Sequence, residues 1–214
     1  MAEQDRRLSD TMTRLPHHST RGSGILNWMS GSSFSFRDLI YTNIVYSDCL
    51  ATNIFLDYVG GQSKLNQWLQ QQGLKTRLIM PYLYFTDEEE AMPRVGSTSA
   101  AEMLRLYRNL DMYSWPQSIR QLLKSALGNI NDSWLEKDSP NMLIDLEHKT
   151  GSMIGCGVRG ETVYNAVGSF NRNSQKYYFC ILSHGFTNKR QAGAEDNFRR
   201  YICGYFSQSI AKLN

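Results

Sequence analysis

The hydrophobic period of this chain changes once, near residue 141, and that change most constrains its fold. Before it, apolar residues recur at helical spacing between capping residues and glycines. We expect helices over residues 36–46, 50–59, 64–72, 100–110 and 116–127. After it, we expect strands over residues 143–150, 161–168 and 177–183, and an amphipathic helix over residues 196–212. A helical block followed by antiparallel strands and a terminal helix predicts the α+β class.

Capping residues and glycines set the expected helix boundaries. Ser35 and Ser63 are expected to cap the first and third helices, and Ser99 with Glu102 forms a capping box for the fourth. Gly60-Gly61 ends the second helix and Gly73 ends the third. The segment over residues 76–96 lacks a helical period and is interpreted as a long loop, which in a compact domain is often functional.

Composition predicts one globular domain over residues 1–214. We divide it into a polar N-terminal segment (1–23), a mainly helical part (24–140), and the sheet with its terminal helix (141–214). The net charge of +3 is too small for a dedicated nucleic-acid binder. The sequence has no run of ~18 apolar residues, so we expect no membrane span. The first ten residues are polar, unlike a signal peptide, so the chain as given is expected to be cytoplasmic.

Cysteines and histidines give no metal-binding pattern. The four cysteines show no C-x-x-C spacing and no cluster with the four histidines, so we expect neither a metal site nor a cofactor. Cys180 is expected in the core, and the sequence leaves a disulfide open. His17-His18 follows a proline in a polar segment and is interpreted as a pair of exposed loop histidines.

Several short motifs occur in an order typical of one enzyme family. These are Gly22-Ser23-Gly24-Ile25-Leu26, Tyr46-Ser47-Asp48-Cys49-Leu50-Ala51-Thr52-Asn53, Gly60-Gly61, Thr98-Ser99-Ala100-Ala101-Glu102-Met103, His148-Lys149-Thr150-Gly151 and Asn165-Ala166-Val167-Gly168. The set resembles the class A β-lactamases and β-lactamase-like serine hydrolases, the penicillin-recognising enzymes, from about Arg7 to the C-terminus. The resemblance implies a β-lactamase-like fold with the terminal helix packed on the sheet.

The family's nucleophile motif, Ser-x-x-Lys, has no usable copy here. The spacing occurs only at Ser209-Ile210-Ala211-Lys212, after the Lys-Thr-Gly segment and therefore in the wrong order. The resemblance implies that the nucleophile segment would precede Met1, so we expect an N-terminally truncated chain that is inactive alone. An upstream segment with an export signal would instead indicate a periplasmic or secreted protein.

The resemblance also implies roles for particular residues. Ser47 would relay a proton toward the leaving nitrogen, and Lys149 would supply positive potential for a substrate carboxylate. Thr150, Gly151 and Ser152 would line the substrate site, with the Ser152 N–H in an oxyanion hole. Cys49 stands where the family has asparagine, which puts ordinary penicillin recognition in doubt. The possible deacylating bases are Glu88, Glu89 and Glu90.

Two functions therefore remain open. The first is a β-lactamase-like serine hydrolase that acts on a β-lactam or related amide through an acyl-enzyme. The alternative is a catalytically inactive relative that binds a carboxylate-bearing ligand or a partner chain. A partner chain would pair at a sheet edge, which the absence of two family strands would expose.

Overall fold

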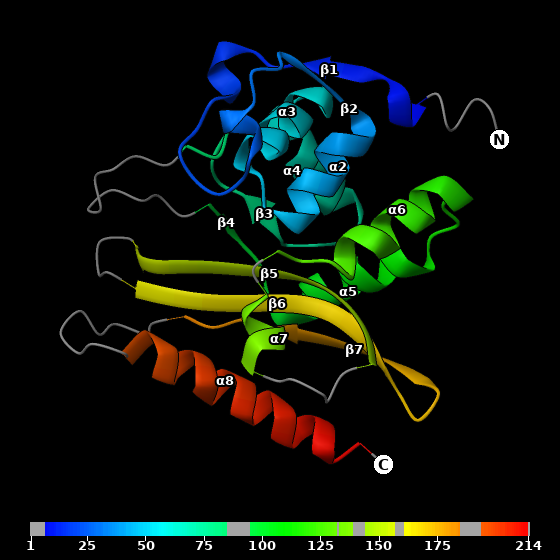
Figure 1. Cartoon of the computed structure of the whole chain (residues 1–214), viewed down its shortest axis with the longest axis vertical. Coiled ribbons are helices and arrows are strands. Elements are labelled where there is room, and N and C mark those ends of the chain that lie inside the picture. Colours follow the sequence, from blue (N-terminus) through cyan, green and yellow to red (C-terminus); the bar gives the residue numbers. More distant parts are fainter. Residues whose placement is uncertain are drawn as a thin grey trace.

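The computed structural model describes residues 7–84, 95–131, 133–138, 144–156, 161–184 and 194–213 (Figure 1). The helices are η1 (Pro16–His18), η2 (Leu26–Trp28), α2 (Phe36–Val45), α3 (Cys49–Tyr58), α4 (Gly61–Gln71), α5 (Ala100–Met112), α6 (Gln117–Leu127), α7 (Trp134–Asp138) and α8 (Ala194–Ala211). The strands are β1 (Thr11–Thr13), β2 (Ser33–Ser35), β3 (Arg77–Leu78), β4 (Gly96–Ser97), β5 (Ile144–Cys156), β6 (Glu161–Arg172) and β7 (Gln175–Ile181).

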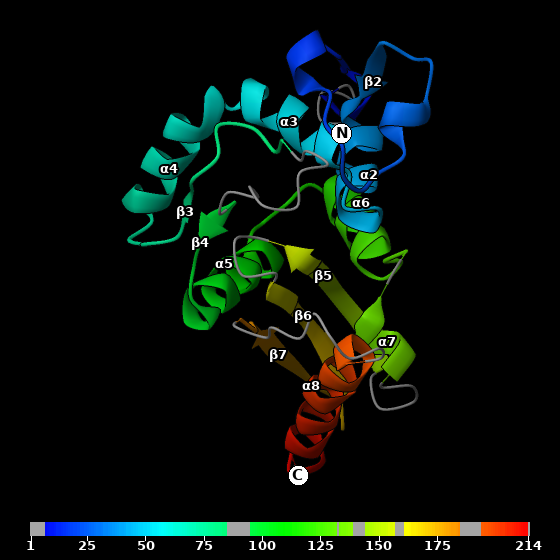
Figure 2. The same cartoon turned by 90° about the vertical axis from the view of Figure 1, so that its left-hand side faces the viewer.

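An antiparallel sheet of order β5-β6-β7 lies between a group of helices that includes α2, α3 and α4 and the terminal helix α8 (Figure 1). Helix α5 lies on one face of the sheet, while α7 and α8 lie on the other (Figure 2). Residues 173 and 174 join β6 to β7 with positive φ angles of 51° and 62°, as a two-residue type I′ hairpin turn requires. The predicted α+β order of helices, three strands and a terminal helix is confirmed.

The core beneath the sheet joins α8 to β6 and β7. Phe206 of α8 packs against Phe179 with ring centroids 4.8 Å apart, and both contact Phe170. Cys203 and Ile210 bury the same helix face in this cluster. Fully burying an aliphatic or phenyl side chain contributes about 1.5–3 kcal/mol, so this face holds α8 to the sheet. The prediction that the terminal helix packs on the sheet is therefore confirmed.

Several local expectations need correction. Ser63 caps no helix, because α4 begins at Gly61 and Gly60 is its N-cap. Gly60 and Gly61 both have positive φ, so the chain reverses there and the next helix starts at once. The helical spacing of apolar residues over 196–212 predicts Tyr205 on the buried face of the last helix, but it is 69% exposed. Cys180 is half-buried instead of a core residue.

The two ends of the long segment after α4 pair with each other. They form a two-stranded ladder in which Arg77 pairs with Ser97. Glu102 at the start of α5 accepts hydrogen bonds from the backbone N–H groups of Lys75 and Thr76. Its carboxylate therefore ties the start of this segment to α5. Glu88, Glu89 and Glu90 lie outside the described residues. In the described part of the chain, no helix is both long and apolar enough to span a membrane.

Candidate active site

A tight turn between α2 and α3 carries the first group of site residues. Helix α2 ends at Val45, and Ser47 follows with a φ of 51°, a left-handed conformation that is uncommon outside glycine. Asp48 then caps α3, because its Oδ1 accepts a hydrogen bond from the N–H of Ala51 at 3.0 Å. The turn therefore places Ser47 at a sharp reversal between two helices.

Asp48 also holds this turn to the segment around Gly24. Its Oδ2 accepts from the N–H groups of Ile25 at 2.7 Å and Leu26 at 2.9 Å, while its side chain is almost fully buried. Gly24 has a φ of 122°, and a Cβ there would lie 2.3 Å from Oδ2 of Asp48. Only glycine fits this position, which explains the second glycine of the Gly-x-Gly motif. Asp48 therefore holds the turn in place through hydrogen bonds from backbone N–H groups.

Strand β5 supplies the second group of site residues. It pairs with β6 so that Lys149 lies opposite Val167 and Gly151 opposite Asn165. At Gly168 a Cβ would lie 2.5 Å from the Glu147 carbonyl, so the glycine allows the two strands to approach closely. The register therefore presents the Lys149–Ser152 segment beside the α2–α3 turn.

A direct contact joins the two groups across 102 residues of sequence. The Lys149 ammonium donates hydrogen bonds to Ser47 Oγ and to the Thr150 carbonyl oxygen. A cavity of about 410 Å³ lies here, and its walls include all six of the predicted site residues outside the acidic run. They are Ser47, Cys49, Lys149, Thr150, Gly151 and Ser152. The structure therefore brings these residues to one place.

Other residues of the cavity were missed by the sequence analysis. Asn43 comes from α2 and donates to Thr52 Oγ1 at 2.6 Å, and Asn131 is held by a bond from its N–H to the Val45 carbonyl. Ser23 and Leu83 complete this part of the wall. Asn43 lies one helical turn before Ser47, so the helical period could have placed it on the same side of the helix axis as Ser47. Asn131 and Leu83 lie in loops and gave no such signal.

Burial shifts the pKa values of Lys149 and Cys49, two of the titratable groups that line the cavity. Removal from water lowers the pKa of Lys149 to about 8, and the nearby Cys49 opposes this shift only in part. Burial raises the pKa of the Cys49 thiol, against weaker opposing hydrogen bonds from Ser23. Near neutral pH the lysine is therefore close to losing its proton, while the cysteine stays a thiol and is a poor nucleophile.

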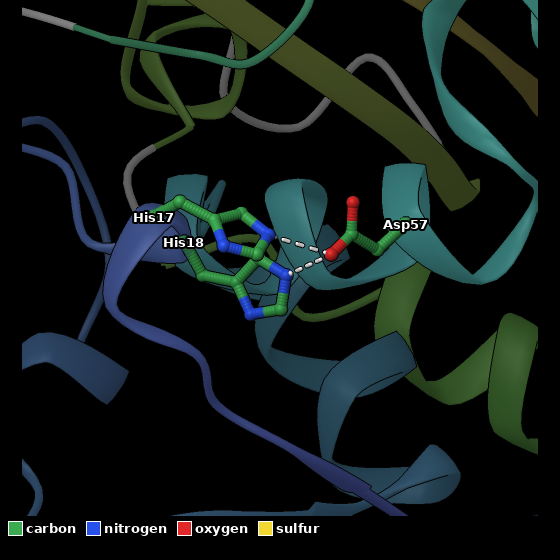
Figure 3. A group of neighbouring side chains, drawn as sticks. All are labelled: His17, His18 and Asp57. Carbon is green, nitrogen blue, oxygen red and sulfur yellow. Dashed lines mark hydrogen bonds and ion pairs between the residues drawn. The ribbon is translucent and has the colours of Figure 1, made fainter.

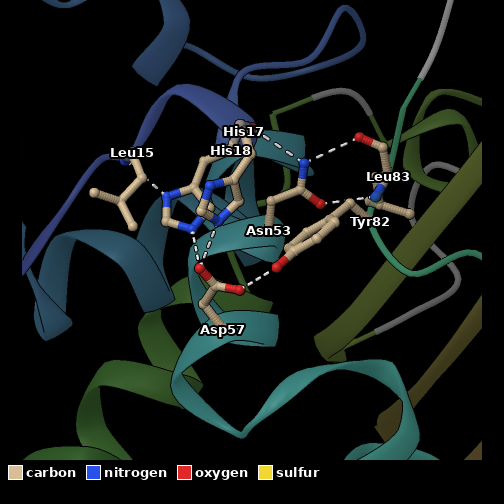
Figure 4. Close-up of polar contacts among 7 residues, drawn as sticks. All are labelled: Leu15, His17, His18, Asn53, Asp57, Tyr82 and Leu83. Atoms are coloured by element: carbon tan, nitrogen blue, oxygen red, sulfur yellow. Dashed lines mark hydrogen bonds and ion pairs between the residues drawn. The ribbon is translucent and has the colours of Figure 1, made fainter.

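A second polar cluster fixes the segment that carries Leu83. Nε2 of His17 and Nε2 of His18 each lie 2.7 Å from Oδ2 of Asp57, and Figure 3 shows both rings converging on this oxygen. Tyr82 donates to the other carboxylate oxygen of Asp57 (Figure 4). One helical turn earlier, Asn53 bonds both the N–H and the carbonyl of Leu83. Helix α3 therefore anchors this stretch of chain beside the cavity.

His18 corrects the expectation that both loop histidines are exposed, because it is 2% exposed while His17 lies near the surface. Nδ1 of His18 accepts the Leu15 N–H at 3.0 Å, so its Nε2 carries the hydrogen that Asp57 accepts. A metal ion would need a lone pair at Nε2, which this tautomer lacks. The cluster His17, His18 and Asp57 therefore fits a hydrogen-bonded anchor better than a metal site.

The helical part and the antiparallel sheet, with the Ser47–Lys149 contact at their junction, define a β-lactamase-like fold. Sequence comparison matches residues 1–200 to the Beta-lactamase enzyme family, to which the chain therefore belongs. Comparison with curated proteins gives no match.

Solved structures of the same fold agree with this assignment. A mutant of PBP-A, determined as its acyl-enzyme complex with penicillin G, is 20% identical with a TM-score of 0.74; the match covers 96% of this chain and 73% of that one. A β-lactamase from Sphaerobacter thermophilus DSM 20745 is 19% identical with a TM-score of 0.71, over 100% and 78% of the two chains. An ancestral class A β-lactamase (GNCA) is 23% identical with a TM-score of 0.70, over 95% and 76%. At these identities the likeness establishes the fold.

Proposed function

We propose that the cavity between α3 and β5 binds a β-lactam or a related amide that carries a carboxylate, as in a β-lactamase-like serine hydrolase. The observation that carries this proposal is the contact between the Lys149 ammonium and Ser47 Oγ. Both residues line a cavity of about 410 Å³. A half-buried lysine is costly unless its charge is used; none of the ion pairs of the described residues includes Lys149, and a ligand carboxylate would provide the anion.

The residues of β5 suit the recognition of such a ligand. Lys149 attracts the carboxylate, and the Thr150 hydroxyl offers it a hydrogen bond. Gly151 lies at the cavity wall, and a Cβ added there would meet nothing within 4 Å, so the glycine leaves room for a ligand beside the strand. Ser152 is exposed next to it and offers its N–H to the reacting carbonyl oxygen.

Cys49 changes how the rest of the ligand is bound. Its Sγ lies 3.7 Å from Ser23 Oγ and 3.7 Å from the Ser47 carbonyl, so it faces protein groups and makes only weak hydrogen bonds. The amides of Asn43 and Asn131 lie in the same cavity and offer both donors and acceptors. These two amides would therefore contact the side chain of the ligand in place of the family asparagine.

The family's acyl-enzyme chemistry needs a serine activated by a neighbouring lysine. The Ser-x-x-Lys spacing in this sequence occurs only at Ser209, whose Oγ bonds the Tyr205 carbonyl within α8, away from the cavity. We propose that this chain contributes ligand binding and proton transfer, and that the full family reaction needs a Ser-x-x-Lys segment. Without one, the cavity acts as a binding site for a carboxylate-bearing ligand.

Calorimetric titration with penicillin G tests the proposal. Lys149→Met keeps the length of the side chain but removes its charge, and should weaken binding at least ~10-fold, as expected for loss of a charged hydrogen bond. Lys64→Met removes a charge from an exposed position on α4 and should bind as the parent does. Equal affinity of the parent and Lys149→Met would refute the proposed site.

A second candidate function is association through the free edge of β7. Within the described residues, β7 pairs only with β6. A cavity of about 690 Å³ beside it is lined by β7, α5 and α8, including Tyr201 and Tyr205, which are about 70% exposed. The charged residue of β7 is Lys176 near its start, and its ammonium is paired with Asp111, so the edge from Tyr177 to Ile181 carries no charge to protect it. We propose a second copy of this chain as the partner, because two antiparallel β7 edges are self-complementary.

Light scattering over a range of concentrations tests the association. A mass that rises toward twice 24.6 kDa with concentration supports it. Leu182→Lys places a charge in the lining of the β7 cavity and should shift the protein to the monomer, while Tyr113→Lys changes an exposed residue elsewhere and should not. A monomer at every concentration, with rapidly exchanging amides along β7, would contradict it.

A further inference from the structure

We infer that Ser47 can itself be acylated in this chain, with Lys149 as the general base that takes its proton. The acyl donor is the activated carbonyl of a β-lactam bound in the same cavity. The inference thus rests on the proposed binding function but adds a nucleophile to it. It differs from the proton-relay role that the family resemblance gives Ser47.

The first support is the direct contact between the two side chains. A nucleophilic hydroxyl must lie within hydrogen-bond reach of its base, and a third group usually orients that base. The Lys149 Nζ meets both conditions, because it contacts Ser47 Oγ and also donates to the Thr150 carbonyl. When the amine is neutral, one N–H can still hold the carbonyl while the lone pair faces the serine. The hydrogen bond then runs from the serine hydroxyl to the amine, as deprotonation requires.

The second support is the backbone of Ser47. Its φ of 51° is a strained conformation for a residue with a Cβ, and such strain persists only where the surroundings hold it. They do so here, because the Asp48 N–H bonds the Thr42 carbonyl and the Cys49 N–H bonds the Ser23 carbonyl. Ser47 is thus held at the cavity wall by a sharp turn, a placement also seen for nucleophilic serines on strand-to-helix turns.

The other candidate nucleophiles that line the cavity are less well placed. Cys49 is 5% exposed, and burial raises the pKa of its thiol. Ser23 Oγ already donates to the Ser47 carbonyl at 2.9 Å. Among the described contacts of the cavity, Ser47 is the hydroxyl that meets a basic nitrogen. This comparison selects Ser47 from the hydroxyls and thiols of the site.

The reaction balances with these two residues alone. The proton of Ser47 Oγ moves to the neutral Lys149 amine as Oγ forms a bond to the lactam carbonyl carbon. The carbonyl π pair moves to its oxygen, which the Ser152 N–H can stabilise. When the carbonyl re-forms, the C–N bond breaks and the ring nitrogen takes the proton from Lys149. The ring opens without loss of an atom, so the adduct has the mass of the chain plus one whole ligand.

The pH dependence follows from the environment of Lys149. Burial lowers the pKa of Lys149 to about 8, so the neutral amine increases as the pH rises through that value. Cys49 and Tyr46 share the cavity wall with it, and burial keeps the Cys49 thiol protonated over this range. The adjacent His148 is neutral there, because burial lowers its pKa to about 4. Acylation should therefore accelerate with pH and level off above about 8.

Intact-mass spectrometry of the chain with penicillin G tests the inference. We expect a gain of one ligand mass, on the peptide that contains Ser47. Ser47→Gly accepts the positive φ without the hydroxyl and should gain no mass, with an unchanged melting temperature. Lys149→Arg keeps the positive charge but cannot act as a base, so it should bind the ligand yet acylate at least ~100-fold more slowly. Ser63→Ala, an exposed change on α4, should label as the parent does.

The outcomes separate the inference from the proposed function. Penicillin binding in calorimetry without a mass gain would overturn the inference and leave the binding site intact. An adduct on any residue other than Ser47, or one formed equally fast by Lys149→Arg, would also overturn it. Absence of both binding and adduct would overturn the two proposals together.

Discussion

His148 Nε2 and Ser133 Oγ lie 2.6 Å apart in the interior, and both side chains are almost fully buried. Ser133 Oγ also accepts the N–H of Glu136 at the start of α7, so the pair links this helix to β5. His148 precedes Lys149 on the strand and therefore points to the opposite face of the sheet. The contact fixes the part of β5 that presents the lysine to the cavity.

His148 should make the protein less stable in mild acid. Burial, helped by the charge of Lys149, lowers its pKa from 6.5 to about 4. Between these values the unfolded chain binds the additional proton, so stability rises with pH from about 4 to 6.5 and is lost as the pH falls. The difference in proton affinity corresponds to about 3 kcal/mol.

Urea unfolding at several pH values measures this dependence. In His148→Phe the residue no longer titrates. The loss of unfolding free energy between pH 6.5 and 4 should therefore shrink by most of the ~3 kcal/mol that His148 contributes. A parent and variant with parallel stability curves over this range would show that His148 is not the responsible group.

The anchor at Asp57 should stabilise the segment beside the cavity. Burial alone would raise the pKa of Asp57, but hydrogen bonds from Tyr82, His17 and His18 outweigh it and hold the pKa at about 2. Its contribution is therefore complete above pH 3.8 and is lost as the pH falls toward 2. Asp57→Asn should cost about 2 kcal/mol at pH 7, because it weakens three hydrogen bonds to a charged acceptor.

Hydrogen exchange locates the effect of Asp57→Asn. The Leu83 N–H, which bonds Asn53 Oδ1 at 2.7 Å, should exchange faster in the variant. Asp196→Asn changes an exposed carboxylate that contacts Arg199 on α8, and should cost less than about 0.5 kcal/mol. Equal losses for the two variants would mean that the cluster is not an anchor.

The sequence was sufficient for the fold but only for part of the site. Helix periods, caps and the Lys-Thr-Gly and Ser-Asp motifs placed α2, α3, β5 and β6, because these signals are local in the chain. Ser47 and Lys149 were expected in one site from the family resemblance, and the structure brings them into contact. Their hydrogen bond depends on the β5–β6 register and the turn at Ser47, which no local pattern encodes.

The anchor at Asp57 shows why the rest was missed. His17, His18, Asp57 and Tyr82 come from three segments, and none belongs to a motif with a recognisable spacing. Burial of His18 results from tertiary packing, so its polar sequence context indicated an exposed residue. Clusters of this kind become visible only when the chain is folded.

The attachment of α8 should depend on its buried face. Phe206→Ala leaves a cavity against Phe170 and Phe179 and should destabilise the protein by about 3–5 kcal/mol. Tyr205 is next to Phe206 in the chain but is mostly exposed, so Tyr205→Ala should lower the unfolding free energy by less than about 0.5 kcal/mol. Thermal unfolding of the two variants measures the difference, and similar melting temperatures would contradict this packing.

Two glycines of the site should respond to alanine in opposite ways. In Gly24→Ala the new Cβ would lie 2.3 Å from Asp48 Oδ2 at a φ of 122°, so the Ile25 and Leu26 hydrogen bonds would break. We expect a loss of at least about 2 kcal/mol in unfolding free energy, and loss of ligand binding with it.

In Gly151→Ala the Cβ meets no protein atom within 4 Å, so the stability should hardly change. It projects beside the proposed ligand, however, and should weaken penicillin G binding. Calorimetry and urea unfolding of both variants separate these effects, and a Gly151→Ala protein that binds as tightly as the parent would place the ligand away from β5.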